Sequence, residues 1–146
     1  MINIIDLLIN TGKVDLRRKI LYQKVHITYL HLAAAESSCE VLKKILSLNV
    51  ININEIDSNG DTPLMYAFKY RKKENIKVLF EKDDLDFNHI NYLGKSVIDE
   101  AKEIYSISFF SFDKTISKNL YLTTLLRFFD EQTIKNFLLK EIQKTK

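Results

Sequence analysis

The 146-residue sequence contains very little cysteine, proline or glycine, and it has no tryptophan. Its single cysteine, Cys39, excludes a disulfide within the chain and a cysteine-rich zinc site. No apolar run reaches the roughly 18 residues of a membrane-spanning helix, and the opening residues lack the basic leader and cleavage site of a signal peptide. We therefore expect a soluble, intracellular protein, cytoplasmic with the nucleus as the alternative, that makes no membrane contact.

The familiar catalytic and metal-binding arrangements are also missing. No nucleophile and base occur at a recognised spacing, and no glycine-rich loop is present to cradle a phosphate. His26, His31 and Cys39 lie close together in the sequence, but no fourth ligand follows at a zinc-site spacing. The acidic residues within 83–86 are typical of a solvated loop. We expect no enzymatic activity, no bound metal and no cofactor.

The charge of the chain is modest and evenly spread. Its formal value is +3, and the basic residues do not gather into a stripe, so the sequence gives no indication of nucleic-acid binding. Hydrophobic residues make up 46% of the sequence, which is enough to bury a core. We expect one domain over residues 1–146, monomeric in isolation.

The few glycines reveal an internal repeat. Gly60 and Gly94 are 34 residues apart, and the same step relates hydroxyl, aliphatic and alanine positions in three successive units. These positions are Thr28, Thr62 and Ser96, then Leu30, Leu64 and Ile98, and then Ala33, Ala67 and Ala101. A period between about 20 and 50 residues is typical of a solenoid, in which each unit buries its apolar face only by stacking on its neighbours.

Within one period the pattern predicts a helix, a turn and a second helix. Thr62 and Pro63 form a helix start, since the threonine hydroxyl can cap free amides and proline at the first helical position loses no hydrogen bond. Apolar residues at helical spacing within 74–80 indicate the second helix, and one period earlier a capping box at 37–40 precedes it. Residues 53–61 alternate in polarity and include Asn-Gly, a strong hairpin-turn signal, so we expect an extended finger between units.

The segment Asp57-Ser58-Asn59-Gly60-Asp61-Thr62-Pro63-Leu64, followed by Ala67, resembles the ankyrin repeat, whose hallmark is Asp-x-x-Gly-x-Thr-Pro-Leu-His-x-Ala. Neighbouring units keep part of this pattern, namely Thr28, Leu30, His31 and Ala33 before it and Gly94, Ser96 and Ala101 after it. The resemblance implies an all-α fold, a solenoid of paired antiparallel helices with β-hairpin-like finger loops. It implies about three to four repeats and a helical C-terminal cap.

The ends of the chain depart from the period. We divide the single domain into a partial N-terminal repeat and connector (1–24), repeats at 25–56 and 57–90, an irregular repeat (91–118) and a degenerate C-terminal capping repeat (119–146). Helical patterns at 120–129 and 134–142 support the cap. Phenylalanines at 109, 110, 112, 128 and 129 either cover the end of the core or form a docking face.

The resemblance also implies where a partner protein would bind. In ankyrin proteins the finger tips and the inner face of each first helix contact partners, so the binding residues are those outside the repeat pattern. The matching positions are Lys24, Val25, Ile27, Ala35, Glu36, Ser58, Asn59, Asp61, Lys69, Tyr70, Tyr92, Leu93 and Lys95. Tyr70, Tyr92 and Leu93 are the expected energetic centres, because aromatic and apolar side chains gain most from leaving water.

Two other functions stay open at this stage. The irregular residues 104–118 and the last two helices could make the chain an adaptor that recruits an enzyme complex. Lys-rich fingers and residues 69–73 could bind nucleic acid, with an affinity that falls steeply with salt. Asn54 and Asn88 match a finger-base asparagine that dioxygenases hydroxylate in many ankyrin proteins, and we expect them to bond the turn instead.

Overall fold

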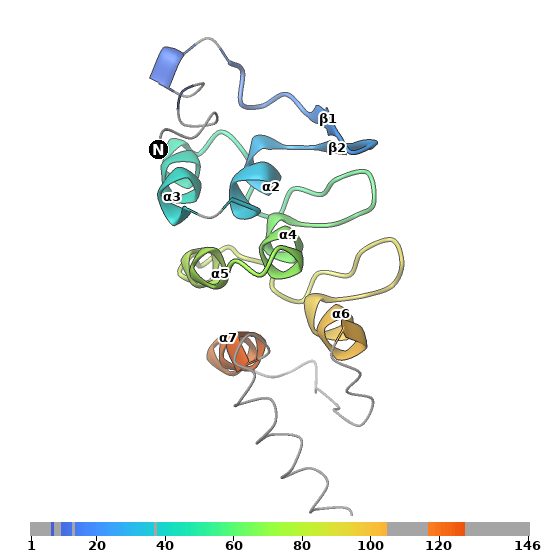
Figure 1. The fold of residues 1–146 in the computed structure, drawn as a ribbon. Coiled ribbons are helices and arrows are strands. Elements are labelled where there is room, and N and C mark those ends of the chain that lie inside the picture. Colours follow the sequence, from blue (N-terminus) through green and yellow to red (C-terminus); the bar gives the residue numbers. More distant parts are fainter. Residues whose placement is uncertain (1–6, 8–9, 13, 37, 105–116, 128–146) are drawn as a thin grey trace, which may run out of the picture. The chain divides into compact units, whose positions relative to one another are not determined.

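The computed structural model describes residues 7, 10–12, 14–36, 38–104 and 117–127 (Figure 1). Contacts divide the chain into two compact units, Met1–Val97 and Ile98–Lys146, which are described separately. The division of the chain into individual repeats stays a prediction. Among the described residues, none of the helices has the length and hydrophobicity of a membrane span.

The first unit is built from two helical pairs. Helices α2 (Tyr29–Ala34) and α3 (Cys39–Leu48) form one pair, and α4 (Pro63–Lys69) and α5 (Lys73–Phe80) form the next. The first helices of the two pairs pack on each other, and so do the second helices, which gives two layers (Figure 1). The predicted all-α solenoid of helix pairs is confirmed.

The helix starts follow the expected capping chemistry. The Thr62 hydroxyl accepts a hydrogen bond from the Met65 amide at 3.4 Å, and Pro63 occupies the start of α4. Thr28 caps α2 in a reciprocal arrangement with His31. One detail of the prediction was wrong: Ser38, not Ser37, caps α3, because its hydroxyl reaches the Glu40 amide at 3.3 Å. Ser37 itself lies outside the described residues.

The core lies between the two helical layers and is lined by the repeat positions. The fully or almost fully buried residues include Leu30, Ala33, Leu42, Ile45, Leu64, Ala67, Ile76 and Leu79. Each of the last four stands 34 residues after one of the first four. The 34-residue period is therefore a packing period, as expected of a solenoid.

Between the layers, a buried asparagine closes the end of a helix. Asn75 of α5 is fully buried, and its side-chain amide donates to the carbonyls of Ala34 at 2.9 Å and Glu36 at 2.7 Å. Helices leave their last carbonyls without partners, so this amide satisfies the end of α2 from the neighbouring pair.

The fingers differ from one another. The first is a true hairpin of β1 (Ile20–Tyr22) and β2 (Val25–Ile27), paired antiparallel with Tyr22 opposite Val25. Its two turn residues, Gln23 and Lys24, have φ of 49° and 68°, which is the geometry of a type I′ turn. The second and third fingers are loops that end in a tight turn (Figure 1).

The described part of the second unit is helical. Helix α6 (Val97–Ile104) begins at the end of the first unit and contains Ala101, and α7 is Lys118–Arg127. The helix expected at 120–129 therefore begins two residues earlier than predicted. The irregular insert at 105–116, the helix expected at 134–142 and the phenylalanines at 109, 110, 112, 128 and 129 lie outside the described residues.

Candidate protein-binding surface

The tight turn of the second finger is organised by Asp57. One carboxylate oxygen accepts hydrogen bonds from the Asn59 and Asp61 amides, both at 2.8 Å. The main chain closes the same turn, with the Gly60 amide donating to the Asp57 carbonyl at 3.1 Å. Gly60 has φ of +79°, a conformation that side chains with a Cβ rarely adopt.

The third finger repeats this turn with an amide in place of the carboxylate. Asn91 accepts hydrogen bonds from the Leu93 and Lys95 amides through its side-chain oxygen, both at 3.0 Å. The Gly94 amide donates to the Asn91 carbonyl at 3.0 Å, and Gly94 has φ of +78°. Residues 34 positions apart therefore adopt the same main-chain geometry.

The two fingers are joined along their main chains. The Tyr92 amide donates to the Asn59 carbonyl at 3.1 Å, and the His89 ring lies 2.8 Å from the Gly60 carbonyl through Nε2. Tyr92 also packs directly over Gly60, where a Cβ atom would stand 2.8 Å from the Tyr92 backbone nitrogen. These contacts hold the second and third fingers together as one platform.

A shallow pocket of about 280 Å³ lies between these fingers. It is lined by Ser58, Asn59, Asp61, Lys69, Asn91, Tyr92 and Leu93. We call this set the finger pocket. Six of its residues were predicted from the sequence as partner contacts, and Asn91 is the addition. Tyr92 and Leu93 expose 71% and 77% of their area beside it.

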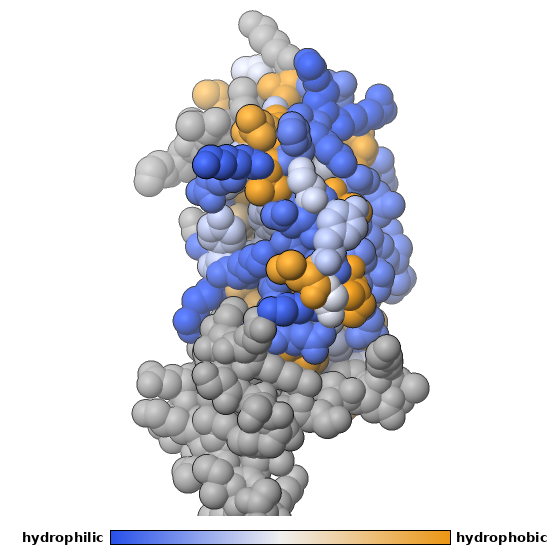
Figure 2. Space-filling view, turned by 90° about the vertical axis from the view of Figure 1, so that its right-hand side faces the viewer, coloured by the Kyte–Doolittle hydropathy of each residue, from blue (hydrophilic) through white to orange (hydrophobic). Residues whose placement is uncertain are grey.

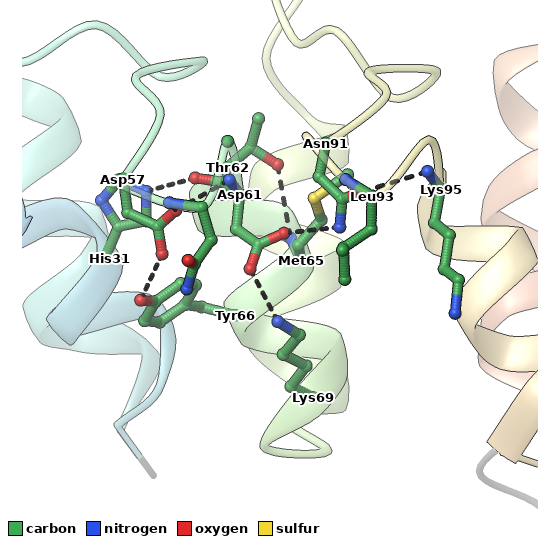
Figure 3. A network of polar contacts seen from close by, with 12 residues as sticks. His31, Asp57, Asp61, Thr62, Met65, Tyr66, Lys69, Asn91, Leu93 and Lys95 are labelled. Carbon is green, nitrogen blue, oxygen red and sulfur yellow. Dashed lines mark hydrogen bonds and ion pairs between the residues drawn. The ribbon is translucent and has the colours of Figure 1, made fainter. Parts of the chain in front are cut away.

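Two of the residues that line the finger pocket, Lys69 and Asp61, form an ion pair. Lys69 contacts Asp61 at 2.7 Å between Nζ and Oδ2, and the Asn91 amide donates to the other Asp61 oxygen at 2.9 Å (Figure 3). Asp61 is almost fully buried, so both contacts compensate its loss of water. Asp61 was expected to touch a partner, and its carboxylate is instead engaged within the chain.

A second polar contact supports the platform from below. The Tyr66 hydroxyl donates to the second carboxylate oxygen of Asp57 at 2.6 Å, and the Tyr66 ring packs edge-on against His31 (Figure 3). Burial raises the pKa of the Tyr66 hydroxyl, and its hydrogen bond to Asp57 raises it further. The hydroxyl therefore remains a proton donor throughout the physiological range.

The remaining candidates fall in different places. Ile27 is fully buried in the core, so the partner contact expected of its side chain was wrong: the hairpin turns this residue inward at the entry to α2. Tyr70 is exposed, and Glu36 and Lys95 are half-buried, but none of these three lines the finger pocket. Lys24 is exposed in the first finger, and Val25 and Ala35 are half-buried.

The hairpin also presents exposed side chains that sequence reasoning missed. Leu21 is exposed to 68%, and Tyr22 lies partly open beside Tyr70. Burial raises the pKa of Tyr70, and Tyr22 adds to the shift through a hydrogen bond. Gln23 and Lys24 gave no turn signal, because type I′ turns normally carry Asn or Gly at these positions.

The face that carries the fingers is mainly hydrophilic, with small separate hydrophobic groups (Figure 2). Isolated apolar side chains among polar ones are the usual make-up of a non-obligate interface, with apolar anchors inside a polar rim.

Other features of the described residues have structural explanations. No group of three or more potential metal ligands occurs among them. Both ring nitrogens of His31 are occupied, by Thr28 and by the Asp61 carbonyl. A larger cavity of about 460 Å³ follows α3, and Asn54 in its wall bonds the Asp84 carbonyl and the Asp86 amide, both at 2.8 Å. Asn54 therefore bonds the neighbouring finger, close to the role expected of it.

Comparisons with known proteins agree with the fold. The family model described as ankyrin repeats, in three copies, matches residues 1–91. The chain is 31% identical to the ankyrin repeat and LEM domain-containing protein 2 homolog of Caenorhabditis elegans, in a match that covers 68% of this chain and 20% of that protein. It is 34% identical to putative ankyrin repeat protein R96 of Acanthamoeba polyphaga mimivirus over 79 residues, covering 54% of this chain and 7% of that protein. The chain belongs to the ankyrin-repeat family.

Proposed function

We propose that this chain is a non-catalytic binding module that holds a partner protein at the finger pocket. Ankyrin repeats generally serve as protein–protein interaction modules and are generally non-catalytic. The observation that carries the proposal is that six of the residues that the family resemblance implied as partner contacts line one pocket. The single thiol of Cys39 supports a reducing, intracellular setting for this role.

Tyr92 and Leu93 are the anchors of the proposed interface. Their side chains are open, while their backbone is fixed by the bonds to Asn59 and Asn91. Because the main chain is already ordered, a partner would not meet the cost of ordering a loop. An open aromatic ring and an open aliphatic side chain on a fixed backbone suit the centre of an interface.

The polar groups of the pocket set its orientation. The charge of the Asp61 carboxylate is compensated by Lys69, and Asn91 donates a hydrogen bond to it, so Asp61 repels an acidic partner little. Lys69 keeps 40% of its side chain exposed, which leaves part of its charge facing the pocket. A partner segment with an apolar side chain for Tyr92 and Leu93 and a polar oxygen near Lys69 fits this arrangement.

The test compares two variants in affinity capture from native lysate. The double variant Tyr92→Ala with Leu93→Ala removes the anchors, and Leu48→Ala removes an exposed leucine of α3 that is outside the pocket. We expect the double variant to lose captured partners by about tenfold or more, since anchor residues each contribute about 2 kcal/mol or more. The Leu48→Ala variant should capture as the unchanged chain does.

Unchanged capture by a correctly folded double variant would refute the proposal. Folding is checked by circular dichroism and by the melting temperature, which neither variant should shift much because both sites are at the surface. A second double variant, Tyr70→Ala with Tyr92→Ala, extends the test to the ring beside the first finger. The chain spans a fifth of one curated relative and less of the other, so their other domains and activities form no part of the proposal.

A further inference from the structure

The outer edge of β1 is open. On the other side of the hairpin, His26 of β2 bonds the second finger: its amide donates to the Ser58 hydroxyl at 3.0 Å, and its carbonyl accepts from the Ser58 amide at 3.3 Å. Leu21 stands directly opposite His26 in the antiparallel register. Because the main-chain groups of His26 bond Ser58, Leu21 and His26 form a non-hydrogen-bonded pair. In a pair of this kind both residues direct their main-chain groups away from the partner strand. The Leu21 amide and carbonyl therefore face outward from β1.

Nothing in the described part of the chain covers this edge. The Leu21 amide and carbonyl have no hydrogen-bond partner among the described residues, and its side chain is 68% exposed. In Figure 1, β1 lies at the end of the row of fingers, beyond β2. An open strand edge is a template on which another extended segment can pair.

The charge beside this edge is mainly positive. Residues 17–24 contain four basic side chains and no acidic one: Arg17, Arg18, Lys19 and Lys24. Lys19 pairs with Glu55 at 3.7 Å, and Asp15 lies just before the segment. Arg17, Arg18 and Lys24 are exposed and flank Leu21 on both sides.

We propose that the open edge of β1 accepts an extended, acidic peptide segment of a partner protein as an added strand. Main-chain hydrogen bonds to Leu21 supply the pairing, and acidic side chains that flank an apolar residue match Arg18 and Lys24. The β1 edge contributes no residue to the finger pocket, so binding at one surface can be lost while binding at the other is kept.

The same charges argue against a second copy of this chain as the occupant. An antiparallel pair centred on Leu21 would bring the basic residues that flank β1 in one copy, Arg18 and Lys24, close to those of the other copy. Like charges brought close together across a strand pair destabilise it. Basic residues on an edge are also a known protection against self-pairing.

The experiment uses a defined probe, a seven-residue peptide with valine at its centre, threonine on each side and two glutamates at either end. Its ends are blocked. Binding is followed by amide chemical shifts and hydrogen exchange of the full chain. We expect saturable binding with shifts centred on Ile20–Tyr22, slower exchange of the Leu21 amide, and about tenfold or more weaker binding of the same peptide with lysines in place of the glutamates.

Two controls separate strand pairing from simple attraction of charge. N-methylation of the three central peptide residues removes their donors without changing the protein, and it should abolish binding. Leu21→Pro removes the edge amide of the protein, and it should do the same while the Val25 amide signal reports that the hairpin persists. Equal binding of the N-methylated peptide, or of the lysine peptide, would overturn the proposal.

Two further outcomes would show that the edge has another occupant or that the peptide binds at another site. Protection of the Leu21 amide that rises with protein concentration, without peptide, would identify a second copy as the occupant and overturn the proposal. Loss of peptide binding in the Tyr92→Ala, Leu93→Ala variant but not in Leu21→Pro would place the peptide at the finger pocket and also overturn it. Retained binding in the pocket variant supports the edge.

Discussion

Two junctions meet at Asp61 and use different chemistry. Toward α2, the main-chain carbonyl of Asp61 lies 2.8 Å from Nε2 of the buried His31. The Thr28 amide can only donate to Nδ1, at 3.2 Å, so Nε2 carries the proton and donates to Asp61. Toward the third finger, the Asp61 carboxylate accepts from Asn91 at 2.9 Å. One junction depends on a neutral histidine and the other on a carboxylate.

The repeat fixes the main-chain geometry of the fingers and not the side chains that hold it. Asp57 and Asn91 organise the same turn with a carboxylate and an amide. His31 has its counterpart in Met65, which has no ring nitrogen to bridge to the next finger. Each junction should therefore fail in its own way when its particular contacts are removed.

The largest effect is expected at the junction with the third finger, from Gly60→Ala. Its positive φ alone costs alanine about 1 kcal/mol, and a Cβ would also stand 2.8 Å from the Tyr92 backbone nitrogen. Forcing these fingers apart adds roughly 2 kcal/mol, as other overpacked sites do. We expect the free energy of unfolding to fall by about 3 kcal/mol in urea denaturation.

Gly94→Ala is the matched control, because Gly94 has φ of +78° and nothing within 4 Å of an added Cβ. It should lose only about 1 kcal/mol. Equal losses in the two variants would mean that the contact with Tyr92 does not constrain the fingers.

The other junction is tested by His31→Met, which places the residue of the second repeat in the first. The change removes the acceptor of the buried Thr28 amide. It also removes one of the two donors to the Asp61 carbonyl, which keeps the Asp57 amide at 2.9 Å. A buried group left without a partner costs about 1–3 kcal/mol, and we expect a loss of about 2 kcal/mol at pH 7.5 in urea denaturation. Met65→Leu, which conserves volume, should lose less than about 1 kcal/mol.

His31→Met should also change the pH dependence of stability. Burial lowers the pKa of His31 from 6.5, outweighing the bond to Asp61 and nearby acids. Below about pH 6.5, His31 binds a proton in the unfolded chain and stays neutral in the folded chain. The free energy of unfolding therefore falls as the pH falls from 6.5 toward the pKa of His31 in the folded chain. The variant should lack this contribution. Parallel stability curves for both proteins between pH 7.5 and pH 5 would contradict it.

The sequence predicted the parts of this structure that follow local rules. Thr62-Pro63 predicted the start of α4, and the step of 34 residues predicted the stack of helix pairs. The resemblance implied hairpin-like fingers, but the residues gave no turn signal at Gln23 and Lys24, which have positive φ although neither is Asn or Gly. It also placed Ile27 at the surface, since the pattern does not say which way the chain turns before α2. Side-chain contacts between fingers, such as Asn91 with Asp61, depend on tertiary geometry that a period does not encode.

A smaller effect is expected from Tyr66→Phe, which acts on the turn instead of on a junction. The change removes the 2.6 Å hydrogen bond to Asp57 and leaves one buried carboxylate oxygen without its donor. We expect the free energy of unfolding to fall by about 1.5 kcal/mol, because hydrogen bonds to charged groups contribute about 1.5–3 kcal/mol. Tyr70→Phe is the matched control at the residue that follows α4. It removes a hydroxyl whose hydrogen bond with Tyr22 lies at the surface, and it should lose less than about 0.5 kcal/mol. Similar losses in the two variants would show that the Asp57 bond has no particular role.

The smallest effect is expected from Lys69→Met, which separates the ion pair from the rest of the Asp61 network. Lys69 is 40% exposed and Asp61 only 3%, so water screens one partner and not the other. Asn91 still donates to Asp61 in the variant, and we expect a loss of about 1 kcal/mol or less. Lys77→Met removes the open pair with Glu74 on α5 and should lose less than about 0.3 kcal/mol. His31 bonds the carbonyl of Asp61, and Lys69 pairs with its carboxylate. The losses of stability in a His31→Met, Lys69→Met double variant should therefore add. Strong coupling between the two changes would mean that the two junctions are linked through Asp61.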